Sequence, residues 1–246
     1  MFASLGAVHV IFDAAAAIAG FWYYLRLRSR TADPIPEEHR WLILAGACVG
    51  GWIGSRALAW AEHPSEFLKQ PILYYVEEKT VIGFLIGAIL GVEIAKTLIG
   101  QRMRSGDLFT FPLILGIMIG RVGCLLAGVA DGTAGSPSTL PWAFDQGDGV
   151  ARHPTSLYEI AFLGLLWCAL RRFVTRVSLP PGHLFRMFVA SYFTFRFAIE
   201  FVKPVHPVWF GLSAIQIACA VVTMFYLVEL LRQSAYTVKN PIWRSS

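Results

Sequence analysis

The chain has 246 residues, of which 56% are hydrophobic and 15% are charged, with a net charge of +5 and a mean hydropathy of +0.56. A soluble domain carries about a quarter charged residues, and its apolar residues form amphipathic stripes rather than long runs. The composition excludes an ordinary soluble domain and predicts an all-α integral membrane protein.

Seven apolar segments are long enough to cross a bilayer, which takes roughly 20 helical residues. They cover residues 3–25, 41–61, 80–99, 107–128, 156–173, 183–203 and 208–231. We expect a seven-transmembrane-helix bundle that forms a single polytopic membrane domain over residues 1–246, with a small outward-facing loop region at 129–154. The first segment carries Asp13 and is followed by LRLRSR, which is typical of a membrane helix rather than a cleavable signal peptide.

Basic residues are unequally distributed between the two sets of connecting segments. With the N-terminus outside, the inner segments hold 12 lysines and arginines and the outer segments hold four. The outer four are Lys69, Lys79, Arg152 and Lys203. Because basic residues favour the cytoplasmic side, we expect an outside N-terminus and a cytoplasmic C-terminus. Topology and contact with anionic membrane lipids explain the positive charge, so nucleic acid is a poor partner.

The first span contains His9 and Asp13, one helical turn apart in its outer half. A carboxylate favours the protonated form of a nearby imidazole, so this pair is a candidate proton acceptor. A structural hydrogen bond between the two is the alternative. Near the inner end of the third span, we expect Glu93 and Lys96 to form a structural ion pair.

Glycines recur every four residues in three of the predicted spans. Small residues at this spacing let helix backbones approach closely in lipid, so the pattern predicts tight packing rather than chemistry. The glycines concerned are Gly46, Gly50 and Gly54; Gly83, Gly87 and Gly91; and Gly116 with Gly120.

Arg56, Arg121 and Arg196 lie in three different spans, each roughly 7–11 Å below the predicted outer boundary. A guanidinium in hydrocarbon is costly unless it is paired, and planar donors suit phosphate, so the three predict an outward-facing anion site. Structural alternatives are that Arg196 pairs with Glu200 and that Arg56 extends to the interface. Arg121 has no carboxylate within four residues on its own helix, so we expect it to bind an anionic ligand rather than a structural partner.

The insert 129–154, VADGTAGSPSTLPWAFDQGDGVARHP, is typical of an ordered outer loop and leads into RHPTSLYEI. Ser156 and Glu159 have the spacing of a helix-capping box. That interpretation leaves Arg152, His153 and Tyr158 as candidate site residues where the loop meets the bundle.

These segments resemble the prolipoprotein diacylglyceryl transferase family in order and spacing: GRVGCLLAG from Gly120, LPWAF, RHPTSLYE, and SYFTFRFAIEFVKP. Family features also occur as GGWIG at 50–54, GFLIG at 83–87 and IQI at 215–217. The resemblance covers most of the chain.

The resemblance implies a bacterial inner-membrane enzyme that moves the diacylglyceryl group of phosphatidylglycerol to the lipobox cysteine of a preprolipoprotein. The products are a thioether and glycerol-1-phosphate, and no metal or organic cofactor is needed. The implied partners are phosphatidylglycerol, preprolipoprotein signal peptides and other membrane lipids. Arg121 and Arg196 match the family's headgroup arginines, and His153 is the candidate proton acceptor besides His9 and Asp13. The candidate substrate-binding residues are Arg56, Gly120, Gly123, Arg152, Tyr158, Glu159, Tyr192 and Glu200.

The chain also departs from the family pattern. The family's Asn-Phe and Asn-Gly-Glu after GRxG fall at Cys124-Leu125 and Ala127-Gly128-Val129, which removes two amides and a carboxylate. A family histidine falls at Ile82, and a first-span tyrosine falls at or near Asp13. Cys124 itself is expected to be a packing residue, since a buried thiol is poorly ionised.

Four functions are therefore weighed. Standard lipoprotein modification leads, and the second is transfer of a phospholipid-derived group to another acceptor, because the polar shell has been rebuilt. The third is a non-catalytic phospholipid-binding protein. A transporter or channel is the fourth, although the sequence has no inverted repeat or broken helix pair.

Overall fold

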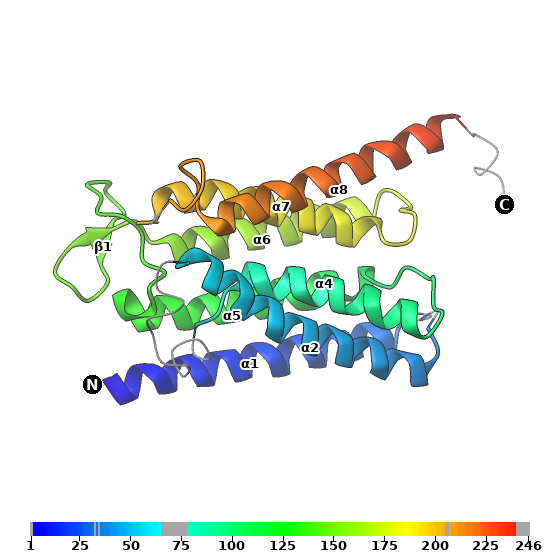
Figure 1. The fold of residues 1–246 in the computed structure, drawn as a ribbon, viewed down its shortest axis with the longest axis horizontal. Coiled ribbons are helices and arrows are strands. Elements are labelled where there is room, and N and C mark those ends of the chain that lie inside the picture. Colours follow the sequence, from blue (N-terminus) through cyan, green and yellow to red (C-terminus); the bar gives the residue numbers. More distant parts are fainter. Residues whose placement is uncertain (1, 32, 34, 65–77, 205–206, 240–246) are drawn as a thin grey trace. The chain divides into compact units, whose positions relative to one another are not determined.

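A computed structural model describes residues 2–31, 33, 35–64, 78–204 and 207–239. Within them lie seven α-helices, which confirms the all-α prediction. The helices are α1 (Phe2–Arg28), α2 (Glu37–Glu62), α4 (Val81–Leu98), α5 (Asp107–Ala127), α6 (Thr155–Val174), α7 (His183–Ile199) and α8 (Ala214–Lys239) (Figure 1). Each of the seven predicted segments overlaps one of these helices.

Five of the described helices are long and apolar enough to cross a membrane. These candidate spans are Val10–Arg28, Glu37–Glu62, Val81–Leu98, Asp107–Asp131 and Ala214–Arg232. Helix α7 is shorter, with 17 residues, and α6 carries Glu159 and ends on charged residues. Large apolar side chains project from the helices, with Leu98 exposed at 81% and Leu165 at 72%. Such exposed apolar surface is typical of helices in contact with lipid, and the chain is an integral membrane protein.

The described helices fall into two compact units. The first contains α1, α5, α6, α7 and the part of α8 from Thr223 onward. The second contains α2, α4 and the start of α8, up to Val222.

In the first unit, α1 packs antiparallel on α5. A Cβ atom on Gly123, near the end of α5, would lie 2.6 Å from the Phe12 side chain in the first half of α1. At the other end, the Tyr24 and Phe109 rings stack with centroids 4.7 Å apart. Early residues of one helix thus meet late residues of the other, as in helices that cross a bilayer in opposite directions.

In the second unit, α2 and α4 pack backbone against backbone. A methyl group on Gly46 would lie 2.7 Å from the Gly91 carbonyl oxygen, and one on Gly50 would overlap the Gly87 carbonyl. The prediction of close packing is therefore confirmed for the first two glycine ladders. It is wrong for Gly120, because a Cβ there would meet nothing within 4 Å.

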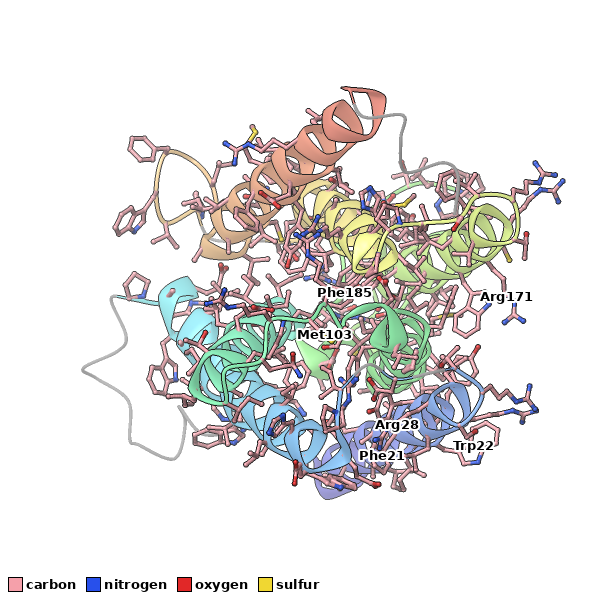
Figure 2. The ribbon with its side chains drawn as sticks, turned by 90° about the vertical axis from the view of Figure 1, so that its right-hand side faces the viewer. Phe21, Trp22, Arg28, Met103, Arg171 and Phe185 are labelled. Atoms are coloured by element: carbon pink, nitrogen blue, oxygen red, sulfur yellow. The ribbon has the colours of Figure 1, made fainter. Side chains whose placement is uncertain are left out.

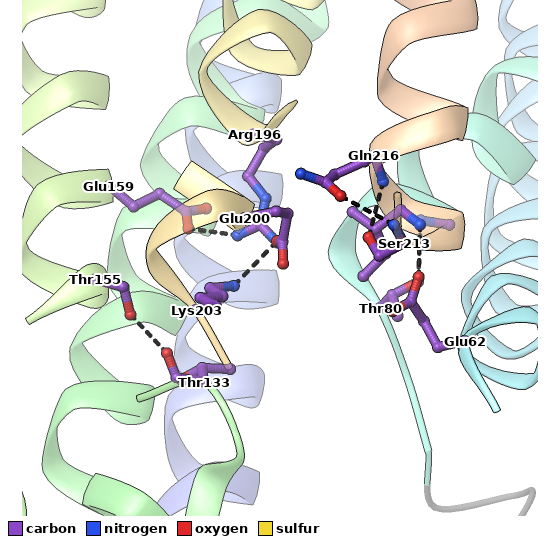
Figure 3. Close-up of polar contacts among 12 residues, drawn as sticks. Glu62, Thr80, Thr133, Thr155, Glu159, Arg196, Glu200, Lys203, Ser213 and Gln216 are labelled. Atoms are coloured by element: carbon purple, nitrogen blue, oxygen red, sulfur yellow. Dashed lines mark hydrogen bonds and ion pairs between the residues drawn. The ribbon is translucent and has the colours of Figure 1, made fainter. Parts of the chain in front are cut away.

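Helix α8 begins at Ala214, six residues after the start of the predicted span at 208. Ser213 and Gln216 form a capping box, in which the Gln216 amide donates to the Ser213 hydroxyl over 3.1 Å and the Ser213 amide donates to Gln216 Oε1 over 2.9 Å (Figure 3). Glu62 accepts a hydrogen bond from the Ile215 amide at 2.6 Å. These contacts satisfy the first amide groups of α8 and fix where it starts.

The insert after α5 is folded. It begins with the 3₁₀ helix η1 (Gly128–Asp131) and continues into the antiparallel strands β1 (Phe144–Asp145) and β2 (Ala151–Arg152). Asp145 Oδ1 accepts hydrogen bonds from the amides of Gly147 and Gly149, at 2.8 and 2.9 Å. These hydrogen bonds lower the pKa of Asp145.

Candidate active site

The central feature of the site is one carboxylate shared by two arginines from different helices. Glu159, in the first turns of α6, has Oε1 3.0 Å from Arg121 Nε of α5. Its Oε2 lies 2.8 Å from Arg196 Nη1 of α7 (Figure 3). The side chains of all three are at most 6% exposed. Three side chains from motifs that resemble the family, Arg121, Glu159 and Arg196, therefore meet in one buried cluster.

Three further side chains complete this cluster. The Tyr192 hydroxyl donates to Glu159 Oε1 at 2.6 Å, and Tyr192 is fully buried. Glu200, in the 3₁₀ helix η2 (Glu200–Val202), accepts from Arg196 Nη2 and, at 3.1 Å, from Lys203 Nζ. The Arg196–Glu200 pair, which was the structural alternative for Arg196, is thus present.

The cluster carries a net positive charge. Among the six side chains just described, three cations, on Arg121, Arg196 and Lys203, face two carboxylates, which leaves 3 − 2 = +1. This count does not include the carboxylate of Asp131, which contacts the Cys124 thiol beside Arg121. In addition, the buried Nε of Arg196 makes no hydrogen bond to any described residue. Since an unmatched buried charge and an unmet buried donor both cost free energy, the cluster is suited to an anion with acceptor oxygens.

Two expectations about the structural partners of these residues are wrong. Glu159 does not close a capping box with Ser156, because α6 begins at Thr155 after Pro154 with no side-chain cap, and the carboxylate is used by the arginines. Arg121 does have a structural partner, which comes from α6 rather than from its own helix. The spacing along one helix carried no information about this partner.

A second polar group lies where the insert joins α6. The Trp142 indole donates to the Tyr158 hydroxyl at 2.6 Å, and that hydroxyl lies 3.2 Å from His153 Nδ1. His153 is held at its backbone as well, where its carbonyl accepts from Gln146 Nε2 at 3.2 Å and from the Gly135 amide at 3.1 Å. Nε2 is consequently the ring nitrogen that is left to exchange a proton with a substrate.

Arg152 lies beside His153 in sequence but is engaged within the insert. Its Nε and Nη2 both bind Asp148 Oδ2, at 2.8 and 2.6 Å. This ion pair raises the pKa of Arg152 and lowers that of Asp148. The contact stabilises the turn of the hairpin.

The remaining candidates come from α1, α2, α4 and α5. Arg56 belongs to the second unit, where its guanidinium lies over the Trp52 ring, 4.5 Å from the centroid. Asp13 is on an exposed position of α1, and the side chain of His9 lies outside what the structure describes. Gly123 packs against α1, whereas Gly120 faces open space next to Arg121. Glu93 and Lys96 form the predicted ion pair, at 2.9 Å.

Three residues of these groups were missed by the sequence analysis. Lys203 had been counted only as an outer charge, although it lies three residues after Glu200. Trp142, within LPWAF, was noted only as part of a motif. Cys124 was expected to be a packing residue, yet its Sγ accepts from Arg121 Nη1 at 3.5 Å, a contact that helical i, i+3 spacing permits.

Comparison with known proteins shows the family of this chain. The model of the prolipoprotein diacylglyceryl transferase family matches residues 7–232. The phosphatidylglycerol–prolipoprotein diacylglyceryl transferase of Methylococcus capsulatus is 33% identical over 199 residues, covering 76% of this chain and 73% of that protein. Proteins of the same name from Nitratidesulfovibrio vulgaris strain DP4 and a Wolbachia of Brugia malayi are 32% and 30% identical, covering 76% of this chain and 72% and 74% of their own lengths. This chain belongs to the prolipoprotein diacylglyceryl transferase family.

Proposed function

We propose that this protein transfers the diacylglyceryl group of phosphatidylglycerol to the lipobox cysteine of a preprolipoprotein. The observation that carries the proposal is the buried cluster around Glu159, where two arginines from different helices converge with an excess of one positive charge. The phosphodiester of phosphatidylglycerol carries one negative charge and would leave the cluster neutral. Family membership supports the same reaction.

Arg121 and Arg196 hold the phosphate in this proposal. Guanidinium groups bind phosphate oxygens through paired N–H donors, and the unmet Arg196 Nε is one such donor. Their fixed positive charge stabilises the glycerol phosphate as it leaves, because donors that are already oriented pay no reorganisation energy. Glu159, which accepts a hydrogen bond from Tyr192, holds the two guanidiniums in place.

His153 is the proposed proton acceptor. The cysteine sulfur forms a bond to the glyceryl carbon while the bond from that carbon to the phosphate oxygen breaks, and the thiol proton passes to Nε2 of His153. With Nδ1 protonated, the imidazole donates to the Tyr158 oxygen, which fixes the ring. The pair His9 and Asp13 is the alternative base, carried only by its spacing in α1.

We further propose a bacterial inner-membrane protein with seven spans in one polytopic domain, an outside N-terminus and a cytoplasmic C-terminus. The antiparallel packing of α1 on α5 and of α2 on α4 supports alternate crossing directions. The distribution of basic residues supports the orientation. The insert and His153 would then face the outside, where lipoprotein precursors arrive.

A second candidate function is transfer to a different acceptor. Beside Arg121 the chain has the Cys124 thiol at 3.5 Å, where the family resemblance leads to an amide, and a second amide is replaced by Ala127. These changes leave the phosphate cluster intact but alter its surroundings. An intact phosphate cluster with altered surroundings is consistent with the same lipid donor and a different acceptor.

The test uses purified protein in liposomes that contain phosphatidylglycerol labelled in its acyl chains, together with a lipobox peptide. Mass spectrometry reports the peptide, and Arg121→Ala is the control. A diacylglyceryl adduct on the peptide cysteine that is lost in the control supports the proposed reaction. Lipid consumption without a peptide adduct favours the second candidate. Bound but unreacted lipid contradicts both and indicates a non-catalytic binding protein.

A further inference from the structure

The first unit carries a strongly basic end that the proposed reaction does not use. The last part of α1 and the last part of α6, with the residues just after them, hold six arginines and no acidic residue over 20–31 and 167–182. The arginines are Arg26, Arg28, Arg30, Arg171, Arg172 and Arg176. A one-sided concentration of this kind attracts anions.

Aromatic contacts hold the ends of these two helices together. The rings of Tyr23 and Trp167 stack with centroids 5.6 Å apart, and Arg171 Nη1 donates to the Tyr23 hydroxyl at 3.5 Å. On α1, the Arg26 guanidinium lies over the exposed ring of Trp22, 5.4 Å from its centroid. Figure 2, which looks onto this end, shows Trp22, Arg28 and Arg171 on the same side of the first unit.

A shallow groove, widely open to the outside and with a volume of about 420 Å³, lies along this end of α6. It is lined by Trp167, Cys168, Arg171, Arg172 and Thr175. Four of these, from Cys168 to Thr175, have the i, i+3, i+4, i+7 spacing of one helix face. The groove therefore combines two guanidiniums and an aromatic wall on a single surface.

We propose that this groove binds the phosphate headgroup of an anionic phospholipid. Arg171 and Arg172 are exposed, and neither forms an ion pair with a carboxylate in the described part of the chain. Exposed apolar side chains lie on the same helix, where acyl chains would run: Phe173, directly after Arg172, is exposed at 39%, and Leu165, about two turns earlier, is exposed at 72%. Basic pockets bordered by membrane helices are suited to such headgroups, whereas free phosphate would gain nothing from the apolar surface.

This lipid site is separate from the candidate active site. Arg171 follows Glu159 by 12 residues in the same helix, which corresponds to about 18 Å along its axis. Lipid at the groove would therefore anchor the ends of α1 and α6 without entering the reaction. The inference does not depend on the proposed function.

The experiment compares lipid binding by the full chain and two charge-matched variants, using native mass spectrometry from detergent. The probes are phosphatidylserine and phosphatidylcholine with identical acyl chains. Arg171→Gln with Arg172→Gln removes the groove arginines, and Arg102→Gln with Arg104→Gln removes two exposed arginines from the second unit. We expect the groove variant to bind phosphatidylserine about 10- to 30-fold more weakly than wild type, because each arginine contributes about a factor of five. The control variant should bind as wild type does.

Three results would overturn the proposal: equal phosphatidylserine binding by wild type and the groove variant, equal losses in both variants, or equally tight binding of phosphatidylcholine to wild type. Displacement of phosphatidylserine by millimolar inorganic phosphate would also overturn it, by assigning the groove to free phosphate. If the double groove variant does not fold, Arg172→Gln alone serves as the test, because its side chain is exposed. An about fivefold loss of phosphatidylserine binding then supports the proposal, and unchanged binding contradicts it.

Discussion

Arg121 and Arg196 are linked through opposite oxygens of Glu159, with Arg121 Nε 3.0 Å from Oε1 and Arg196 Nη1 2.8 Å from Oε2. The two arginines are 75 residues apart in the chain and lie on different helices. A single carboxylate thereby sets the separation and the orientation of both guanidiniums.

Glu159→Gln is expected to destabilise the protein. The substitution removes the carboxylate charge that the buried Arg121 and Arg196 guanidiniums share, and breaking a buried ion pair costs about 3–5 kcal/mol. We expect a lower thermal unfolding temperature in detergent and loss of transfer activity. Glu93→Gln is the matched control, because its side chain is 64% exposed in its pair with Lys96. Equal unfolding temperatures for the two variants would contradict a central role for Glu159.

Arg196→Lys is expected to reduce catalysis more than stability. Lysine keeps the charge near Glu159 and Glu200 but loses the planar donors, including Nε, that are proposed to bind phosphate. We expect kcat/KM for phosphatidylglycerol to fall about 10- to 100-fold, which corresponds to about 1.4–2.8 kcal/mol of lost transition-state stabilisation. The measurement is transfer to the lipobox peptide, with circular dichroism to verify helix content. A variant with normal kcat/KM would refute phosphate binding by Arg196.

His153→Gln and Asp13→Asn distinguish the two candidate bases. If His153 accepts the thiol proton, its loss lowers kcat by about 10²- to 10⁴-fold, whereas Asp13→Asn leaves kcat unchanged. Tyr158→Phe removes the hydroxyl that lies 3.2 Å from the ring and gives an intermediate loss. If only Asp13→Asn lowers kcat, the proton acceptor is the His9 and Asp13 pair on α1 rather than His153.

Gly87→Ala is expected to disrupt the second unit. The added methyl group would overlap the Gly50 carbonyl, so α2 and α4 have to separate along their contact. Overpacking of this kind costs about 1–3 kcal/mol. Gly164→Ala is the control, because a Cβ there meets nothing within 4 Å. We expect thermal unfolding to shift downward for Gly87→Ala only, and an equal shift in both variants would argue against backbone contact.

The turn that follows β1 is expected to loosen in acid. The pKa of Asp145 is lowered by amide hydrogen bonds, first from Gly147, so its stabilising contribution is present above the ordinary value of 3.8 and is lost as the pH falls below it. Hydrogen exchange of the Gly147 and Gly149 amides measures this directly. Asp145→Asn should show weak protection already at neutral pH. Protection that persists in the variant would show that the turn does not depend on the carboxylate.

Helix positions and the close glycine contacts could be predicted from the sequence, because apolar length and small-residue spacing are local properties. The partner of Arg121 could not, since Glu159 lies 38 residues away and its spacing to Ser156 suggested a cap. The start of α8 was likewise misplaced, because the capping box at Ser213 competes with an apolar run that begins earlier. Pairing between distant helices depends on how the helices pack, and a single sequence does not contain that directly.

The excess of one positive charge in the Glu159 cluster also bears on how a reaction cycle ends. Phosphatidylglycerol is a monoanion, but a phosphate monoester such as glycerol phosphate carries about −1.5 to −2 at neutral pH. The substrate balances the cluster, whereas the product leaves it with surplus negative charge in a buried place, where uncompensated charge is costly. Glu159 and Glu200 lower the positive charge of the cluster and therefore limit how strongly the arginines retain the glycerol phosphate that they have helped to form.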